Sequence, residues 1–234
     1  MYKDKFISAV IVAAGASSRM KKGISKQLIP LLGKPALSYT VSAFLSCEIT
    51  DEIIIVCPIN DIDNFKSVFD VKNSKVPIKF IEGGMTRQES VFKGVSVTDS
   101  RSEFIAVHDG ARPLIQPELI KKVIGDAIVY SAATLAVPVK DTIKLVEDNV
   151  ISSTPERDKL RAIQTPQVFD KQLYLSAYNA SAENSLDFTD DCQLVEYYGK
   201  KIYVTQGDYT NIKITTPEDI AVAEVYLKLR GENK

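Results

Sequence analysis

Three short polar segments carry the residue types that could do chemistry, and each one follows an apolar run. The first, "VAAGASSRM", spans Val12 to Met20 and is followed by Lys26. Its glycine and small residues would let backbone N–H groups approach anionic oxygens. Arg19 would add a planar fork of donors, and Lys26 a point charge. The segment predicts an anion-binding loop, although a plain strand-to-helix turn with solvated cations fits it equally well on its own.

Three known loop templates do not match this segment. A dinucleotide fingerprint needs Gly-x-Gly-x-x-Gly, and here only Gly15 is a glycine. A P-loop needs Gly-Lys-Ser/Thr after four intervening residues, which this loop lacks. A nucleophile elbow needs Gly-x-Ser-x-Gly, and Arg19 stands at its last position. Ser17 and Ser18 are therefore not expected to be nucleophiles, and a nicotinamide-dependent oxidoreductase is disfavoured.

The second segment, "GGMTRQES", begins at Gly83 and repeats the chemistry of the first. Gly83 and Gly84 permit close approach of the backbone to a ligand. Arg87 is expected in the first turn of the following helix, and Ser90 about one turn later. The segment favours an anion site, with a solvated first-turn arginine as the alternative.

The third segment, "HDGARP", contains the single histidine of the chain. A lone histidine cannot form the clustered site of a metallohydrolase, so we interpret His108 as a structural residue. Asp109 is a carboxylate at the end of a predicted strand, beside Gly110 and near Arg112. It suits a Mg²⁺-nucleotide, whose ion prefers oxygen ligands, or a substrate hydroxyl.

The elements that must position these segments alternate between strand and helix. Predicted strands cover Phe6–Ala14, Glu52–Cys57, Ile78–Gly84, Phe104–Pro113 and Ala133–Val139. Predicted helices begin at Pro35, at Thr86, at residue 117 (ending at 130) and at Pro217. The alternation predicts an α/β fold with a mostly parallel, twisted sheet and helices on both faces. Because ligands gather at the carboxyl ends of such strands, the three polar segments should meet there.

Composition and charge are those of an ordinary globular domain. The 234 residues are 45% apolar, and 29 basic residues nearly balance 30 acidic ones. This predicts one domain over residues 1–234 and disfavours general binding to nucleic acid or to a membrane surface. Cys47, Cys57 and Cys192 are scattered, which favours reduced thiols in the cytoplasm over a zinc site or disulfides. The chain has no apolar run near the ~20 residues of a membrane helix, and no signal peptide is expected.

Residues 140–157, "KDTIKLVEDNVISSTPER", do not suit a compact core. Two short alternating strands flank a Glu-Asp-Asn turn, which predicts a hairpin. An isolated hairpin is only marginally stable in water. We expect this arm to pack against a second subunit, with a solvated excursion as the alternative.

Taken in order, the segments resemble one enzyme family. They are "VAAGASSRM" with Lys26-Gln27, "GGMTRQESV", "VHDGARP", "PVKDTIK", "TPERDKLRAIQTPQVF", "TDDCQLVE" and "NIKITTPED". Together they resemble the 2-C-methyl-D-erythritol 4-phosphate cytidylyltransferases of the non-mevalonate isoprenoid pathway. The resemblance implies a Rossmann-like nucleotidyltransferase that moves CMP from CTP to this sugar-alcohol phosphate and releases pyrophosphate. It also implies Mg²⁺ and a homodimer joined through the 140–157 arm.

The resemblance further implies roles for single residues. The implied catalytic residues are Arg19, Lys26, Arg157 and Lys213, the first two acting on the nucleotide phosphates and the last two positioning the sugar phosphate. The implied CTP-binding residues are Ala13, Ala14, Gly15, Ala16, Ser17, Ser18, Arg19, Lys26, Gly84, Arg87, Ser90, Asp109 and Gly110. The implied residues for the second substrate are Asp109, Arg112, Thr142, Arg157, Thr165, Thr189 and Lys213. The metal would be held mostly by CTP phosphates, with Asp109 as the candidate protein ligand.

Two positions depart from the family pattern. Ser17 stands where a second glycine is common, and Gly110 stands where alanine is common. A glycine at position 110 resembles the pattern of the related ribitol-5-phosphate cytidylyltransferases. Those enzymes, however, usually carry "AGG" where this chain has Ala13-Ala14-Gly15. Ribitol 5-phosphate or another polyol phosphate is therefore the alternative substrate. A non-catalytic nucleotide-binding or scaffold protein is disfavoured, because all four implied catalytic cations are present.

Overall fold

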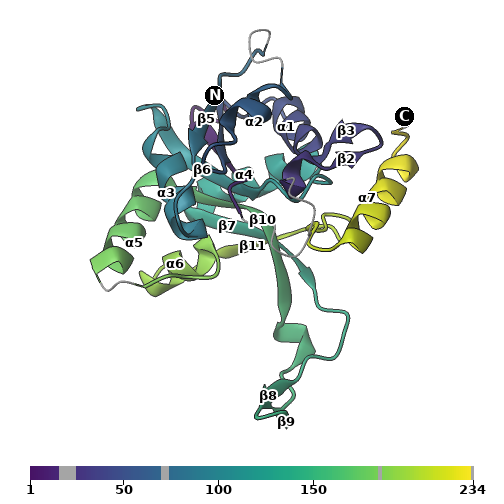
Figure 1. The fold of residues 1–234 in the computed structure, drawn as a ribbon. Helices are drawn as coiled ribbons and strands as arrows, with labels where there is room; N and C mark the ends of the chain where they lie inside the picture. Colours follow the sequence, from purple (N-terminus) through teal and green to yellow (C-terminus); the bar gives the residue numbers. More distant parts are fainter. Residues whose placement is uncertain (16–24, 70–73, 184–185, 233–234) are drawn as a thin grey trace.

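The computed structural model describes residues 1–15, 25–69, 74–183 and 186–232. Within these ranges a seven-stranded sheet forms the centre of the molecule (Figure 1). Its order is β11 (Tyr203–Gln206), β7 (Ala132–Pro138), β10 (Arg161–Asp170), β6 (Ser102–Asp109), β1 (Phe6–Val12), β4 (Glu52–Cys57) and β5 (Ile78–Glu82). Six of these strands run in one direction, and β10 runs antiparallel to both of its neighbours. The prediction of a mostly parallel α/β sheet is confirmed.

The central strands are apolar and β-branched because both of their faces are covered. Every residue of β1 and of β4 is buried. Val12, the last residue of β1, lies in register with Val56 of β4 and with Asp109 of β6. This register brings the ends of three strands, and the segments that follow them, to one edge of the sheet.

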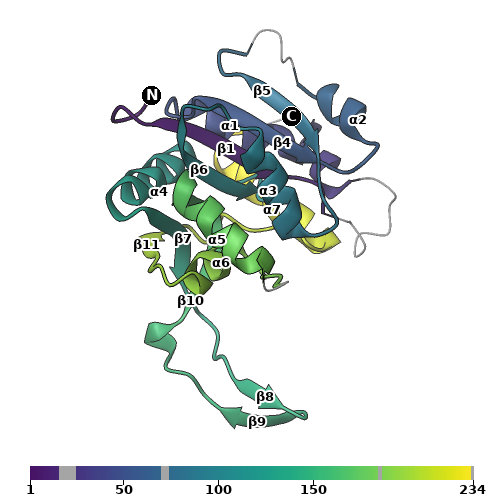
Figure 2. The same cartoon turned by 90° about the vertical axis from the view of Figure 1, so that its left-hand side faces the viewer.

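Helices cover the sheet from both sides. They are α1 (Ala36–Ser46), α2 (Ile62–Lys66), α3 (Arg87–Ser96), α4 (Pro117–Tyr130), α5 (Lys171–Glu183), α6 (Asp191–Tyr197) and α7 (Pro217–Leu229). One core cluster joins the sheet to α1, α2 and α4, and a second joins its other face to α3, α5 and α6. Figure 2 shows the latter three helices together on one side of the sheet. α7 packs on the small sheet of β2 (Pro30–Leu31) and β3 (Lys34–Pro35) in a third cluster.

Local signals placed several helices correctly. α4 covers the predicted residues 117–130, and its first residue is Pro117. α7 begins at Pro217, behind a capping box formed by Thr216 and Asp219. Thr86 caps α3 by accepting a hydrogen bond from the backbone N–H of Glu89. The sequence patterns predict no element for β10, β11, α5 or α6, so two of the three strands on the β10 side of β6 are identified only by the structure.

The predicted hairpin is confirmed. β8 (Leu145–Glu147) and β9 (Val150–Ser153) pair antiparallel around Asp148 and Asn149, whose φ angles are 49° and 63°. Two consecutive positive φ angles are typical of the tight type I′ hairpin turn. The hairpin stands at the end of a long excursion between β7 and β10, well away from the sheet (Figures 1 and 2). A short 3₁₀ helix, η3 (Arg157–Lys159), interrupts its return.

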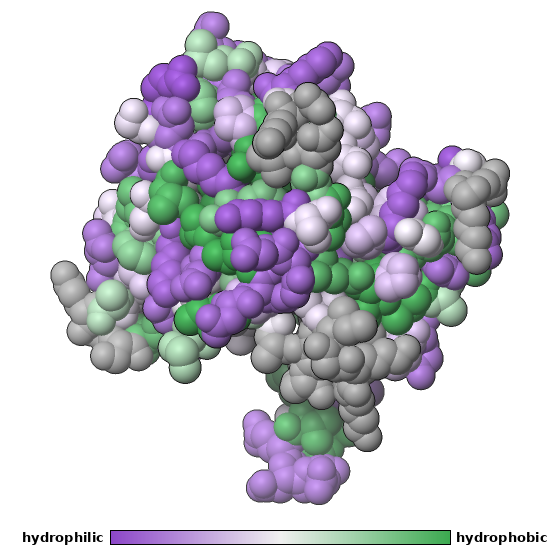
Figure 3. Space-filling view, turned by 45° about the horizontal axis from the view of Figure 1, so that its top comes forward, coloured by the Kyte–Doolittle hydropathy of each residue, from purple (hydrophilic) through white to green (hydrophobic). Residues whose placement is uncertain are grey.

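The arm exposes several apolar side chains to solvent in the single chain. Leu145, Val146, Val150 and Ile151 are all more than half exposed. In the space-filling view the arm stands clear of the body and carries both apolar and hydrophilic residues (Figure 3). None of the helices in the described ranges combines the length and the apolar character that a membrane span requires. The three cysteines are free and buried.

Candidate functional site

The polar segments after β1, β5 and β6 meet at the carboxyl edge of the sheet. A side chain at Gly83 would overlap the Cβ of Ala14, so the loops after β1 and β5 are in direct contact there. The backbone N–H of Gly110 donates to the carbonyl of Val12 over 2.9 Å, which ties the loop after β6 to the end of β1. The structure therefore brings together the parts of all three segments that it describes.

Gly110 fits a crowded position. A Cβ at this residue would lie 3.2 Å from both Leu37 Cδ1 and the Val12 carbonyl oxygen, and 3.4 Å from the Cβ of Ala13. These distances are tight for an alanine, so the family's usual residue would require its neighbours to shift by a few tenths of an ångström. The glycine lets β1 and β6 end in close contact.

Ser90 fixes the glycine turn at the start of α3. Its hydroxyl donates to the carbonyl of Thr86 over 2.8 Å and accepts from the backbone N–H of Gly84 over 2.9 Å. The side chain is buried. Ser90 therefore shapes the turn by bonding to its backbone.

Asp109, at the end of β6, is surrounded by three cations. Its Oδ2 lies 2.8 Å from Lys213 Nζ and 3.8 Å from Arg112 Nε, and its Oδ1 lies 3.5 Å from Arg87 Nη2. Burial opposes ionisation of this carboxyl, but Arg87, Lys213 and Arg112 hold its pKa well below the ordinary value. Asp109 is thus a carboxylate, and the cations around it exceed its single charge.

A hydrogen-bonded pair, His108 and Thr165, contacts the backbone of Asp109. Thr165 Oγ1 accepts from the backbone N–H of Asp109 over 3.1 Å and lies 3.0 Å from His108 Nδ1. His108 Nε2 lies 3.2 Å from the carbonyl oxygen of Arg112, which can only accept. Nε2 therefore carries the proton, and Nδ1 accepts from the Thr165 hydroxyl. Burial lowers the pKa of His108 to about 4, so the ring is neutral and structural, as the sequence predicts.

A buried asparagine brings Lys213 to the site from a distant part of the chain. Asn211 Nδ2 donates to the carbonyl of Thr165 over 3.0 Å, and the carbonyl of Asn211 accepts from Arg112 Nη1 over 2.8 Å. The backbone N–H of Ile214 donates to the carbonyl of Ala111 over 2.8 Å. These bonds hold the loop before α7 against β10 and against the loop after β6.

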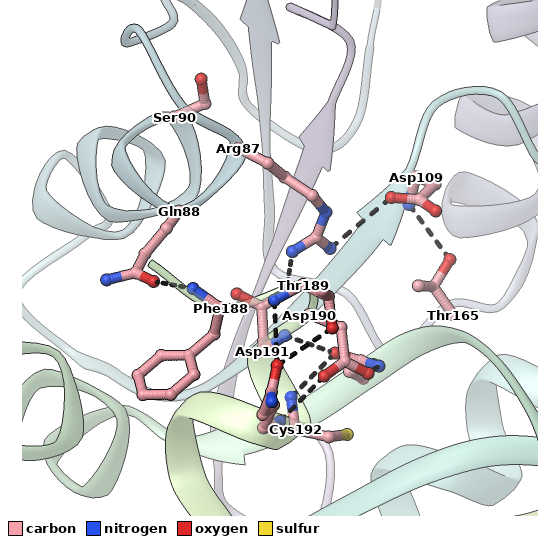
Figure 4. Close-up of polar contacts among 12 residues, drawn as sticks. Arg87, Gln88, Ser90, Asp109, Thr165, Phe188, Thr189, Asp190, Asp191 and Cys192 are labelled. Atoms are coloured by element: carbon pink, nitrogen blue, oxygen red, sulfur yellow. Dashed lines mark hydrogen bonds and ion pairs between the residues drawn. The ribbon is translucent and has the colours of Figure 1, made fainter. Parts of the chain in front are cut away.

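A second carboxylate, Asp191, lies beside the first. Arg87 Nη1 is 2.7 Å from Asp191 Oδ2 (Figure 4). The hydroxyl of Tyr174 donates to Asp191 Oδ1 over 3.1 Å. Sequence analysis assigns no role to Asp191, Tyr174 or Gln167. Gln167, in β10, accepts a hydrogen bond from the backbone N–H of Asp191. Consecutive aspartates at residues 190 and 191 indicate a helix start, and α6 does begin there, but they carry no further local signal.

The remaining predicted residues lie in three different places. Thr189 stands just before α6, beside Asp191, and its Oγ1 donates to Gln193 Oε1 over 3.0 Å (Figure 4). Thr142 and Arg157 are exposed on the arm, where Arg157 Nη1 donates to the carbonyl of Lys140 over 3.2 Å. Ala16, Ser17, Ser18, Arg19 and the side chain of Lys26 lie outside the described residues.

The surroundings of Asp109 do not fit a direct metal ligand. Both carboxylate oxygens already face cations, and a divalent ion on Oδ2 would stand next to the Lys213 ammonium. In the part of the chain that the structure describes, no group of three or more His, Cys, Asp or Glu side chains is arranged to hold a metal ion. A divalent cation would therefore depend on oxygen atoms that a bound polyphosphate brings.

Basic side chains gathered at the strand ends of a mostly parallel sheet suit a polyphosphate, and the fold that presents them here is that of the nucleotidyltransferase enzymes. The chain belongs to the 2-C-methyl-D-erythritol 4-phosphate cytidylyltransferase family, whose model matches residues 7–229. The resemblance noted in the sequence is thereby confirmed.

Relatives and solved structures match nearly the whole chain. The 2-C-methyl-D-erythritol 4-phosphate cytidylyltransferase of Caldanaerobacter subterraneus is 47% identical over 224 residues, which cover 95% of this chain and 99% of that protein. The chloroplastic enzyme of Oryza sativa is 40% identical and is covered over 74% of its length, against 95% of this chain. The 4-diphosphocytidyl-2C-methyl-D-erythritol synthase of Anaerococcus prevotii superposes with a TM-score of 0.84 at 37% identity, covering 96% of this chain and 99% of that one.

Proposed function

We infer that the chain transfers CMP from CTP to 2-C-methyl-D-erythritol 4-phosphate, giving 4-diphosphocytidyl-2-C-methyl-D-erythritol and pyrophosphate. Family membership over residues 7–229 supports this reaction. The observation that carries it structurally is the convergence of Arg87, Arg112 and Lys213 on Asp109 at the end of β6. Cations in excess at the carboxyl edge of the sheet suit a reaction between two phosphates.

The reaction needs little covalent help from the protein. A phosphate monoester has its second pKa near ~6, so at neutral pH it is largely a dianion and already a nucleophile. One of its oxygens bonds to the α-phosphorus of CTP, while the bond from that phosphorus to the bridging β-oxygen breaks. The electron pair of the broken bond leaves with pyrophosphate. No general base is required, in keeping with a histidine that is buried and neutral.

The main obstacle is repulsion between anions. Two unit charges ~4 Å apart repel by about 4 kcal/mol at an effective dielectric of 20. In our proposal Arg19 and Lys26 stabilise charge on the nucleotide phosphates, while Lys213 and Arg157 position the sugar phosphate in line with the α-phosphorus. The other proposed CTP-binding residues are Ala13, Ala14, Gly15, Ala16, Ser17, Ser18, Gly84, Arg87, Ser90, Asp109 and Gly110, and those for the second substrate are Asp109, Arg112, Thr142, Thr165 and Thr189.

Mg²⁺ is the proposed metal, and it accompanies CTP rather than occupying a site of protein ligands. Bound to the triphosphate, it would neutralise part of the phosphate charge. Because three cations contact Asp109, we propose that this carboxylate orients basic side chains rather than the metal. The protein's own contribution is then to place and charge-balance the two substrates.

The proposed assembly is a homodimer through the 140–157 arm. The exposed apolar residues of the arm support it. Two proposed substrate-binding residues, Thr142 and Arg157, also belong to this arm, whose hairpin stands away from the sheet (Figure 1). A neighbouring subunit's arm would supply these residues to the site.

The test is pyrophosphate release with Mg²⁺, CTP and a set of sugar-alcohol phosphates. We expect turnover with 2-C-methyl-D-erythritol 4-phosphate to exceed that with ribitol 5-phosphate or erythritol 4-phosphate. Replacing CTP with ATP, GTP or UTP controls for the nucleotide. Preferred use of ribitol 5-phosphate would instead establish the alternative substrate, and a lack of release with every phosphate would refute the proposed function.

A further inference from the structure

Asp191 is a buried carboxylate, and the free-energy cost of burying its charge must be offset by its partners. Its side chain is 2% exposed, and taking a carboxylate out of water is expensive unless it is paired and hydrogen-bonded. The Arg87 guanidinium supplies the charge and the Tyr174 hydroxyl a hydrogen bond. Because Arg87 contacts both Asp191 and Asp109, we looked for a role of this buried carboxylate beyond packing.

Arg87 joins the two carboxylates. Nη1 lies 2.7 Å from Asp191 and Nη2 lies 3.5 Å from Asp109, so the stronger contact is to Asp191. In Figure 4 the guanidinium reaches from α3 towards both aspartates, while the Ser90 side chain points away from them. Burial opposes the charge on Arg87, but Asp191 and Asp109 raise its pKa above the ordinary value. The arginine is therefore a fixed positive charge.

The surroundings of Asp191 hold it rigidly. Gln167 Oε1 accepts from the backbone N–H groups of Asp191 and Cys192 over 3.1 and 3.2 Å. The amide of Gln167 donates to Asp190 Oδ2 over 2.8 Å. Gln167 belongs to β10, the strand that also carries Thr165 under Asp109. One strand thus supports both carboxylates.

We propose that Asp191 is a positioning residue that draws Arg87 away from Asp109 and so leaves Asp109 Oδ2 to orient Lys213. Without the Asp191 charge, the guanidinium would close onto Asp109, which is its remaining carboxylate partner. Lys213 and Arg112 would then compete with it for the same two oxygens. This inference rests on the proposed function, in which Lys213 positions the sugar phosphate.

The test compares Asp191→Asn, Arg87→Gln and the double variant by steady-state kinetics with each substrate varied. Asp191→Asn keeps the shape of the side chain but removes its charge. We expect kcat/KM for the sugar phosphate to fall about tenfold, with a smaller change in KM for CTP. In the Arg87→Gln background the same substitution should add less than about twofold, because Asp191 acts through Arg87. Full multiplication of the two effects would overturn the proposal.

Glu52→Gln is the matched control. Glu52 is also a buried, ion-paired carboxylate, but it starts β4 at the opposite edge of the sheet, where it binds Ser8 and Lys79. The Glu52→Gln substitution should lower the melting temperature and leave kcat unchanged. That result would show that loss of a buried charge does not by itself account for a kinetic effect of Asp191→Asn. Should Asp191→Asn fail to fold, Arg87→Lys replaces it, because one ammonium cannot span both carboxylates and kcat/KM should still fall.

Two outcomes are kept apart by the wild-type measurement. An inactive wild-type chain, with CTP and methylerythritol phosphate, would refute the proposed function. An active wild type with unchanged kinetics in folded Asp191→Asn or in Arg87→Lys would refute the positioning role alone.

Discussion

Lys213 Nζ lies 2.8 Å from Asp109 Oδ2, although the two residues belong to segments far apart in the sequence. The ammonium is therefore already oriented by a carboxylate that is itself held by the backbone N–H contact to Thr165. Preorganisation of this kind lowers the cost of placing a charge where phosphate must bind.

Removing the Lys213 charge should affect mainly the sugar phosphate. We expect Lys213→Met to lower kcat/KM for methylerythritol phosphate by roughly 10²–10³-fold, because a positioned cation is lost from the reacting phosphates. KM for CTP should change much less. Lys213→Arg, which keeps the charge, is the control and should retain more activity. If Lys213→Met raised only KM for CTP, the assignment of Lys213 to the sugar phosphate would be wrong.

Arg19 and Lys26 should govern turnover itself. Replacing either with alanine is expected to reduce kcat by about 10²-fold or more, since each would stabilise charge that develops on the nucleotide phosphates. Lys34→Ala serves as a control, because Lys34 is largely exposed and approaches only Glu232, at 4.0 Å, among the charged groups described near it. Near-wild-type turnover of Lys26→Ala would contradict the assignment.

The arm proposal predicts complementation between inactive variants. If the arm reaches the neighbouring subunit, a mixed dimer of Lys213→Ala and Arg157→Ala protomers contains one site with both native residues and one site with neither. Refolding the two variants together should therefore restore activity that neither shows alone. The control is a mixture of the same variants kept from exchanging subunits. A mixture as inactive as its parts, with exchange verified, would show that each chain uses its own arm.

Stability should fall in mild acid because of His108. Burial lowers the pKa of His108 from an ordinary 6.5 to about 4, so between these values the unfolded chain binds a proton that the folded chain does not. Stability therefore rises with pH across this window, and acid removes at most about 1.4 kcal/mol per pH unit through this residue. Denaturant unfolding at pH 4.5 to 7 would measure the slope. His108→Asn should be less stable at pH 7 and show a shallower slope; equal slopes would refute the attribution.

Two helix glycines should respond in opposite ways to alanine. At Gly94 a Cβ would lie 2.5 Å from Val10 Cγ1 and 3.0 Å from Val56 Cγ2, so Gly94→Ala should destabilise the protein by about 1–3 kcal/mol. At Gly125 the nearest atom is the Tyr2 hydroxyl oxygen at 3.9 Å, and Gly125→Ala should stabilise α4 by about 0.5–1 kcal/mol. Urea unfolding of both variants measures the contrast. Equal effects would mean that α3 does not pack so closely on β1 and β4.

Helix starts and apolar strands could be predicted because their signals are local. Pro117 and Pro217 occupy first helical turns, and β4 is an unbroken apolar run after Glu52. β10 could not be found in this way. Its sequence "RAIQTPQVFD" has polar residues at buried positions, and these are satisfied by partners from other segments. Gln164 donates to the carbonyl of Asp208, for example, and Thr165 accepts from Asp109.

By itself, the sequence determined the α/β class, the hairpin and which polar segments end the strands, because periodicity, capping and turn residues act over a few positions. It also supplied the cations that the proposed reaction needs. The tertiary structure decided which charges meet: Lys213 with Asp109, and Arg87 with the unforeseen Asp191. Ion pairing depends on the distance between charges and on their burial. Here both depend on how β10 and the loop before α7 pack against the end of β6, not on neighbours in the chain.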